Sequence, residues 1–388
     1  MTFFTQLSAV TRMGFASMRQ RLGPSLVVVI GMACAVGALL SVLSLSTGIM
    51  NVLNKGREDR AIVLSQGSQF EGGSTITRAN ASVIADLPGV KRTANGRPAA
   101  SADVLSGIRV TKKSDGLETG QEVRGVGPDV LALRPEIRMV AGRMFQPGKF
   151  EVIVGKNAPI LYRNMNIGDR IDLPQGDWKI VGVYDSGGNF LESSILTDAQ
   201  TLGSAMRQAT YKSVTVMLES PAALDSFRRA LANNPTLSVE VTREPAYWER
   251  LGAQVNAIFR VIAYVVGGIM GLGAMFGAIN TMYAAVSNRR VEIATLRAIG
   301  FGGTAVVFSV LAEALSLALI GAIIGAVVAW AAFSGNLTSF SGVALTLAVT
   351  PAMAVNGVLF ACLLAFLGGF FPALRAARQP IATALRAT

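Results

Sequence analysis

Four long apolar stretches constrain this chain more than any other feature of its sequence. They cover residues 24–50, 254–286, 305–333 and 351–371. Each is long enough to cross a bilayer as a helix, which takes roughly 20 apolar residues. The composition agrees, because 51% of the residues are hydrophobic and only 15% are charged. We therefore expect an integral membrane α-helical protein with four transmembrane helices, because a soluble domain would carry more charge.

Arginines flank these stretches in a pattern that predicts orientation. Basic residues mark the cytoplasmic side of membrane helices, and four crossings place every basic flank on one side. Residues 1–23, 287–304 and 372–388 are then cytoplasmic, with both termini inside, whereas residues 51–253 and 334–350 lie outside. The flanking residues are Arg12, Arg19 and Arg21, then Arg289, Arg290 and Arg297 with Glu292, and last Arg375, Arg378 and Arg386.

The formal net charge of +11 does not indicate nucleic-acid binding. The large segment 51–253 holds 25 basic and 22 acidic residues, which is an ordinary balance for a soluble domain. The excess belongs to the short membrane flanks. The expected partner of these arginines is the lipid bilayer, and we expect no nucleic acid.

The first apolar stretch could instead be a cleaved signal peptide, or a lipoprotein signal ending at Cys34. Its apolar run is about twice the usual 7–15 residues, and no small-residue cleavage site follows it. We expect a retained helix. Cys34 and Cys362 both lie inside apolar runs, so we expect them to be packing residues and not a disulfide or metal site.

Catalytic motifs are missing from the sequence. The chain contains no histidine, which removes the commonest general base and metal ligand. The segment 142–150 contains a Gly-Lys pair, but its spacing is one residue too long for a phosphate-binding loop and Phe150 replaces the required hydroxyl. We expect a chain that is not an enzyme and that binds no cofactor or metal. Any ATP hydrolysis must come from another chain.

Residues 51–253 read as an α+β domain inserted between the first and second helices. Period-two alternation and turn residues predict its strands, and a turn at Gln175–Asp177 predicts a hairpin. The expected strands are 61–65, 151–155, 170–173, 178–184, 214–218 and 238–241, and the expected helices are 79–86, 198–207 and 222–232.

Two kinds of residue stand out within the apolar stretches. Glycines at four-residue spacing allow helix backbones to approach closely in lipid. These helix-packing candidates are Gly267, Gly271, Gly273, Gly277, Gly321 and Gly325. Arg260 and Glu313 are the charges inside the stretches, and intramembrane charge often marks function. Both lie close enough to an interface to extend into it, and they sit near opposite faces, so an intramembrane enzyme is not expected.

The loop 287–304 predicts a short amphipathic helix at 289–300. Asn288 can cap its start, Glu292 and Arg297 suit its first and last turns, and Gly300 can close it in the left-handed conformation. Ile293, Leu296 and Arg297 project from one side. Such a helix either rests on lipid headgroups or docks onto a partner.

The runs RVEIATLRAIG at 290–300 and FPALRAARQPIATALR at 371–386 resemble the MacB/FtsX/LolCE family of ABC transporter permeases, the type VII mechanotransmission class. The resemblance extends over the whole chain. Residues 152–155, 166–171 and 181–184 are similar to the MacB-like periplasmic core of that family.

This resemblance implies a permease of the bacterial inner membrane that works as a homo- or heterodimer with two copies of a cytoplasmic ABC ATPase. ATP and magnesium would bind to the ATPase. The helix 289–300 would be the coupling helix that relays ATP-driven movement to the periplasmic domain. Its implied ATPase-coupling residues are Arg289, Arg290, Glu292, Ile293, Leu296, Arg297 and Gly300. Unlike MacB, this chain shows no fused ATPase domain.

The cargo remains open at this point. Export or efflux of a hydrophobic compound competes with the handling of lipoproteins or lipid-linked substrates and with FtsX-like regulation of cell-wall hydrolases. A periplasmic adaptor or substrate protein is a further candidate partner. A different class of protein, a membrane-anchored periplasmic sensor or scaffold, would not depend on an ATPase.

Overall fold

The computed structural model describes residues 22–340 and 342–378. The chain divides into two compact units. The helical unit contains the chain up to Thr47, Ala257–Asn336 and the chain from Leu347, and the strand-rich unit contains Gly48–Asn256 and Leu337–Thr346. The predicted flank arginines Arg12, Arg19, Arg21 and Arg386 lie outside the described residues.

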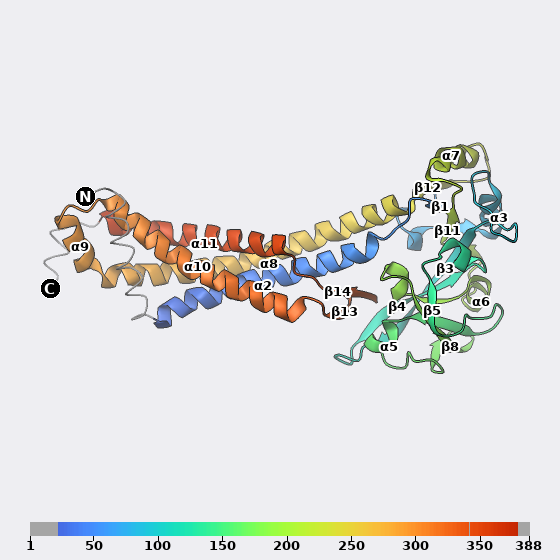
Figure 1. The fold of residues 1–388 in the computed structure, drawn as a ribbon, viewed down its shortest axis with the longest axis horizontal. Helices are drawn as coiled ribbons and strands as arrows, with labels where there is room; N and C mark the ends of the chain where they lie inside the picture. The colour runs from blue at the N-terminus through green and yellow to red at the C-terminus, as the bar shows by residue number, and fades with distance from the viewer. Residues whose placement is uncertain (1–21, 341, 379–388) are drawn as a thin grey trace. The chain divides into compact units, whose positions relative to one another are not determined.

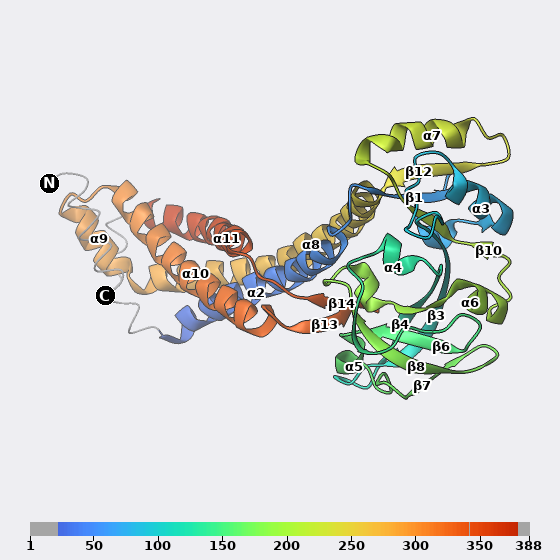
Figure 2. The same ribbon diagram turned by 45° about the vertical axis from the view of Figure 1, so that its right-hand side comes forward.

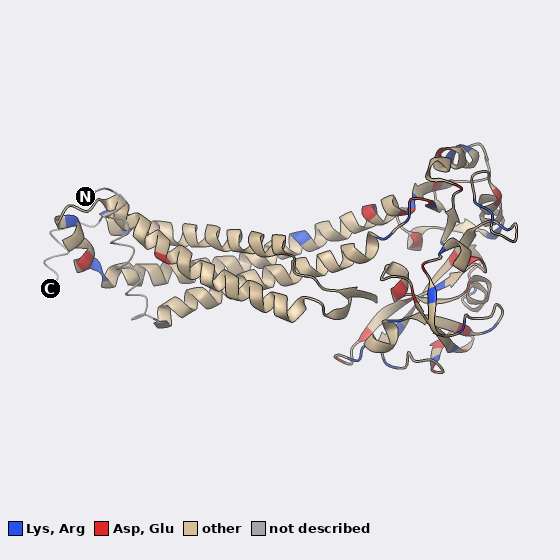
Figure 3. Ribbon diagram, in the orientation of Figure 1, with Lys and Arg blue, Asp and Glu red and all other residues tan. Residues whose placement is uncertain are grey.

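Within the described residues, four helices long and apolar enough to cross a membrane confirm the predicted fold class. They are α2 (Leu22–Leu53), α8 (Glu244–Asn288), α10 (Gly303–Phe333) and α11 (Pro351–Arg378). They lie alongside one another in both ribbon views (Figures 1 and 2). Figure 3 shows that these helices carry few charges along their length. The protein is therefore a membrane protein.

Helix α8 is longer than its apolar stretch. It is one helix of 45 residues, and its first part, 244–256, belongs to the strand-rich unit. The C-terminal end of α2, from Gly48, belongs to that unit as well. Two of the four helices thus continue without interruption from one unit into the other.

Glycines set the close approach of α10 to α2. A Cβ added at Gly321 would lie 2.5 Å from the carbonyl oxygen of Val29, and one added at Gly325 would press on the carbonyl oxygen of Ala33. The four candidates on α8 differ from these. Gly267, Gly271 and Gly277 face side chains, whereas Gly273 has nothing within 4 Å of an added Cβ.

The strand-rich unit is built on one ten-stranded sheet, in the order β12-β1-β11-β3-β4-β9-β6-β8-β5, with β7 paired to β8. Its first half joins β1 (Arg60–Ser65), α3 (Arg78–Asp86), β3 (Ala100–Thr111), β11 (Ser213–Met217), α7 (Leu224–Ala232) and β12 (Val239–Arg243). This order of two β-α-β units in an antiparallel sheet is ferredoxin-like. Both helices share one buried core with the strands.

The second half is inserted between β3 and β11. It contains β4 (Glu118–Val126), α4 (Val130–Leu133), β5 (Arg138–Gly142), β6 (Glu151–Gly155), α5 (Ala158–Leu161), β7 (Arg170–Leu173), β8 (Gly176–Asp185), β9 (Ile195–Asp198) and α6 (Ala199–Ala205). Two short turns of 3-10 helix, η2 (Glu71–Gly73) and η3 (Phe190–Ser193), contribute to the sites below, and η4 (Pro221–Ala223) precedes α7. Smaller pairs are β2 (Ile76–Thr77) with β10 (Thr210–Tyr211), and β13 (Leu337–Phe340) with β14 (Val343–Thr346).

The predicted hairpin is confirmed, because β7 and β8 pair antiparallel around a turn in which Gln175 and Gly176 have positive φ. Two predictions are wrong. Asn288 does not cap the helix in the loop, because it is the last residue of α8 and Arg289 holds the cap position of α9 (Arg290–Ala298). Cys34 is exposed on α2, so it does not pack inside the chain.

Candidate functional sites at the ends of the membrane helices

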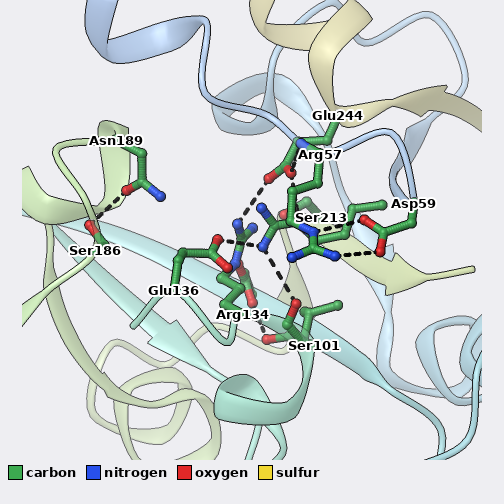
Figure 4. Close-up of polar contacts among 12 residues, drawn as sticks. Arg57, Asp59, Ser101, Arg134, Glu136, Ser186, Asn189, Ser213 and Glu244 are labelled. Carbon is green, nitrogen blue, oxygen red and sulfur yellow. Dashed lines mark hydrogen bonds and ion pairs between the residues drawn. The ribbon is translucent and has the colours of Figure 1, made fainter. Parts of the chain in front are cut away.

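A buried ion-pair network surrounds the first residue of α8. Both oxygens of the Glu244 carboxylate are engaged, at 2.6 Å from Arg60 Nε and at 2.9 Å from Arg134 Nη1. The backbone N–H of Arg57 also donates to Glu244 (3.0 Å), and Arg60 pairs with Glu136 at 2.5 Å. Figure 4 shows Glu244 pointing between Arg57 and Arg134. The network therefore fixes the start of α8 to β1, which follows α2 in the chain.

The charged side chains of this network are buried, so they must be paired with one another. Arg60 is 1%, Glu244 2% and Arg134 4% exposed. Charges removed from water are tolerated only when they are paired and hydrogen-bonded. A carboxylate in the first turn also suits the positive end of the α8 dipole. Any displacement of α8 along its axis must break these pairs or carry the attached strands with it.

The loop that connects β8 to β9 meets the same helix ends. Lys55 Nζ, just after α2, donates to the carbonyl oxygen of Gly187 (2.7 Å), and the rings of Phe190 and Trp248 of α8 lie 5.0 Å apart. Glu192, buried in this loop, accepts hydrogen bonds from the N–H groups of Gly188 (2.7 Å) and Ser186 (3.1 Å). We call residues 185–194 the junction loop.

The short loop between α10 and α11 contains a third connection. Its hairpin, β13–β14, belongs to the strand-rich unit. Tyr162 Oη lies 2.5 Å from Ser339 Oγ, and the N–H of Ala344 donates to Ser193 Oγ of the junction loop (2.8 Å). The junction loop therefore touches segments that lead to α2, to α8 and to the α10–α11 pair.

A second buried charge cluster lies between η2 and the central strands. The Arg124 guanidinium holds Glu71 with two parallel hydrogen bonds (2.7 and 3.0 Å) and reaches Asp103 at 2.9 Å and Glu122 at 3.1 Å. Burial raises the pKa of Glu71, but Arg124, together with a hydrogen bond from Ser213 and the charge of Arg134, more than offsets this, so that the pKa lies below its ordinary value. Burial raises the pKa of Asp103 above its usual range, although Arg124 opposes the rise.

The predicted coupling residues gather on and beside α9. Arg289 lies 3.4 Å from Glu313 of α10, which joins α9 to the membrane helices. Ile293 is buried in the core of the helical unit. Leu296 and Arg297 are half-buried, and Gly300 ends the helix with φ +100° as predicted. Exposed positions are Arg290, Val291, Glu292, Thr295, Ala298, Ile299 and Gly300.

The side of α9 that carries Ile293, Leu296 and Arg297 is therefore not the exposed side of the helix. Ile293 packs inward, and the exposed large apolar side chains of α9 and its C-terminal cap are Val291 and Ile299, at 41% and 72% exposure. Glu313 is 7% exposed and pairs with Arg289, so its charge is compensated within the helical unit. Arg260 is exposed on α8, and the structure gives it no ion pair among the described residues.

We expect the alanine variant of Gly342 to release the hairpin β13–β14 from the strand-rich unit. Gly342 has φ +81°, and an added Cβ would press on the carbonyl oxygen of Gly120. Hydrogen exchange of the Ala344 amide should accelerate roughly tenfold or more, because its bond to Ser193 is lost. Gly335→Ala is a matched control, since Gly335 has the same φ of +81° but nothing within 4 Å. Equal exchange rates in both variants would contradict docking by the hairpin.

Comparisons with known proteins agree with this architecture. The family model described as MacB-like periplasmic core domain matches residues 25–234, more than half of the chain. The model described as FtsX-like permease C-terminal matches residues 264–381.

Three relatives illustrate the similarity. The macrolide export ATP-binding/permease protein MacB of Brucella melitensis is 21% identical over 98% of this chain, which spans only 60% of that protein. An uncharacterized ABC transporter permease, MJ1507 of Methanocaldococcus jannaschii, is 22% identical over 95% of this chain and 96% of its own length. A second one, YknZ of Bacillus subtilis, is 22% identical over 69% of this chain and 70% of its own length.

Among solved structures, the extracellular domain of the noncanonic ABC-type transporter YknZ from Gram-positive bacteria aligns with a TM-score of 0.36 and 15% identity, and covers 47% of this chain and all of that domain. An inserted periplasmic-core domain followed by an FtsX-like permease region, together with four apolar helices, defines the assignment. The chain belongs to the MacB/FtsX family of ABC transporter permeases.

Proposed function

We propose that this chain couples ATP hydrolysis by a separate cytoplasmic ATPase to movement of its strand-rich unit. Membership of an ABC permease family implies an ATPase partner. In the proposed complex, two permeases bind two ATPase subunits, and ATP and magnesium remain on the ATPase.

The observation that carries the proposal is the continuity of α8. This single helix begins at Glu244, inside the buried network of the strand-rich unit, and ends at Asn288, next to α9. A helix is stiff along its axis because its backbone is hydrogen-bonded throughout. A push on α9 can therefore reach Glu244 without depending on loops.

The surface of α9 suits a docking role. Arg289 and Ile293 are turned inward and hold α9 to the helical unit, so a load on α9 is passed on to α8 and α10. Arg290, Glu292 and Ile299 are exposed and offer a mixed charged and apolar contact. Interfaces of this kind use charge for orientation and apolar groups for affinity.

Location follows from the distribution of charge. The arginines beside α9 and at the end of α11 support a cytoplasmic location for these segments under the positive-inside rule, with the strand-rich unit outside. We propose the bacterial inner membrane as the location. The relatives named for macrolide export make export of a hydrophobic compound the leading cargo class, with lipoprotein or lipid-linked substrates and cell-wall hydrolase regulation as alternatives.

Charge reversal on α9 tests the proposal. In nanodiscs with the ATPase, Arg290→Glu combined with Glu292→Lys should lower permease-stimulated ATP hydrolysis at least several-fold, because an interface charge of the wrong sign repels its partner. Asp225→Lys, an exposed reversal in the strand-rich unit, is the control and should leave hydrolysis unchanged. A sensor or scaffold that does not use an ATPase would show no stimulation in any of these proteins.

A further inference from the structure

The short hairpin β13–β14 is tied closely to the end of a membrane helix. It follows α10 after three residues and precedes α11 by four. Helix α10 has 31 residues, or about 46 Å, which matches the thickness of a bilayer with its headgroups. Trp330, exposed near the end of α10, is of a type enriched at the membrane–water interface. We therefore expect the base of the hairpin at the membrane surface.

Two contacts fix the direction of the β3–β4 turn along this hairpin. At the turn of the hairpin, Gly342 lies against Gly120 of β4, because an added Cβ would press on the carbonyl oxygen of Gly120. Nearer to α10, Ser339 Oγ lies 2.5 Å from Tyr162 Oη, and Tyr162 forms a backbone bridge with Lys112 at the start of the β3–β4 turn. The β3–β4 turn therefore points toward the base of the hairpin.

The β3–β4 turn and helix α5 are held together. Lys113 Nζ donates to the carbonyl oxygen of Pro159 (2.6 Å), and the N–H of Arg163 donates to the carbonyl oxygen of Thr111 (3.0 Å). The chain also limits how far this part can lie from α10. Ser339, which contacts it, is six residues beyond the helix, and an extended chain covers at most about 3.6 Å per residue, or roughly 22 Å. We call residues 111–118 and 158–163 the β3–α5 tip.

The β3–α5 tip exposes apolar and basic side chains together. Leu117 is 64% and Ile160 62% exposed, and large apolar side chains that share an exposed surface often mark a contact. Glu118 is compensated by Arg109, at 3.7 Å. The other charges of the tip are three basic and one acidic, for a net charge of +2, and they belong to Lys112, Lys113, Arg163 and Asp115.

We propose that the β3–α5 tip rests on the membrane surface at which α10 ends. Leu117 and Ile160 enter the headgroup layer, and Lys112 and Arg163 bind the phosphates of anionic phospholipids. Apolar and basic side chains on one surface are typical of protein segments that lie in the membrane interface. The inference requires only that α10 and α11 cross the membrane, so it does not depend on ATPase coupling.

The covalent connection to α10 favours lipid as the occupant of the tip. A tethered contact is intramolecular and forms at a high effective concentration, so a small surface is sufficient for it. A second copy of this chain would have to pair two tips of the same positive charge, and like charges across an interface oppose binding.

Lipid quenching of a fluorophore tests the contact in the full chain. Cys34→Ala and Cys362→Ala remove the two cysteines of the chain, and Leu117→Cys then provides one site for an environment-sensitive fluorophore. In nanodiscs that contain phosphatidylglycerol, a lipid with a spin-labelled headgroup should quench this fluorophore. Val83→Cys is the control, because Val83 is exposed on α3, which both ribbon views show far from α5 within the strand-rich unit (Figures 1 and 2). Quenching at position 117 should be several-fold stronger than at position 83.

Charge reversal tests the role of the basic side chains. Lys112→Glu combined with Arg163→Glu changes the charge of the tip from +2 to −2 and should weaken quenching at position 117 several-fold. Arg228→Glu with Arg229→Glu, the same reversal on α7, should leave it unchanged. Equal quenching at positions 117 and 83, or quenching at position 117 that survives the reversal, would overturn the proposal. A blue-shifted fluorophore without lipid quenching would also overturn it, because protein would then cover the tip.

Discussion

Replacing Arg124 with methionine is expected to lower the free energy of unfolding of the strand-rich unit by about 3–5 kcal/mol, since removing one partner leaves buried charges without compensation. Arg124 is 1% exposed and contacts three carboxylates, of which Glu71 and Asp103 are themselves buried. Trp330→Phe in the background leaves Trp178 and Trp248, both in this unit, as the fluorescent reporters of unfolding in the full chain.

The loss of unfolding free energy in the Arg124→Met variant should depend on pH. Without Arg124, the folded-state pKa values of Glu71 and Asp103 rise, because the largest favourable interaction that opposes burial is lost. A group with a raised folded pKa is favourable at low pH and loses that stability as pH rises through the folded pKa. The deficit of the variant should therefore be larger at pH 8 than at pH 5. Arg109→Met, on an exposed arginine of β3 that pairs with Glu118 at 3.7 Å, is the control and should change stability little. A deficit independent of pH would contradict the role given to Arg124.

Replacing Gly321 and Gly325 together with alanine should destabilise the helical unit by about 2–6 kcal/mol, as overpacking costs about 1–3 kcal/mol at each site. Both added Cβ atoms would press on backbone carbonyl oxygens of α2, which cannot move aside as a flexible side chain can. Resistance of the full chain to unfolding in a graded detergent series reports the change.

Gly273→Ala provides the matched control on α8, because an added Cβ there has nothing within 4 Å. It should unfold at the same detergent concentration as the parent. If the double variant of Gly321 and Gly325 also unfolds like the parent, α2 and α10 do not approach each other through these glycines.

Two features of the sequence, long apolar stretches and the arginines that flank them, were sufficient to predict the membrane architecture. Apolar stretches of about 20 residues and flanking arginines are properties of contiguous residues, so the four helices could be predicted from them. The β7–β8 hairpin was predictable for the same reason, since its turn is local. Strands β3 and β4 were missed because they are rich in glycine and polar residues, although they pair with each other over eight positions across a short connection. Their other neighbours, β11 and β9, lie far along the chain.

The candidate sites were predictable only in part. Helix α9 could be found from its caps and charges, but the inward turn of Ile293 could not, because a short amphipathic run does not reveal which neighbour covers it. The networks at Glu244 and Arg124 were missed entirely. Their members are separated by up to 187 residues, and a charged residue in a soluble segment reads as exposed unless its partner is known.

The loop between α10 and α11 illustrates the same limit. Its residues 334–350 read as a short connection outside the membrane. The hairpin β13–β14 within it is held by contacts to Tyr162 and Ser193, which precede it by more than 140 residues. Two positive-φ glycines, Gly335 and Gly342, were the available local signal for a structured turn.

Hydrogen exchange of the junction loop, 185–194, in the reconstituted permease–ATPase complex tests the central claim most directly. Trapping the ATPase with magnesium and a non-hydrolysable ATP analogue should change exchange in this loop, through α8 and Glu244, and the change should disappear when Arg290→Glu and Glu292→Lys are combined. Unchanged exchange in the parent while the ATPase turns over, or the same change in the reversed variant, would contradict the account.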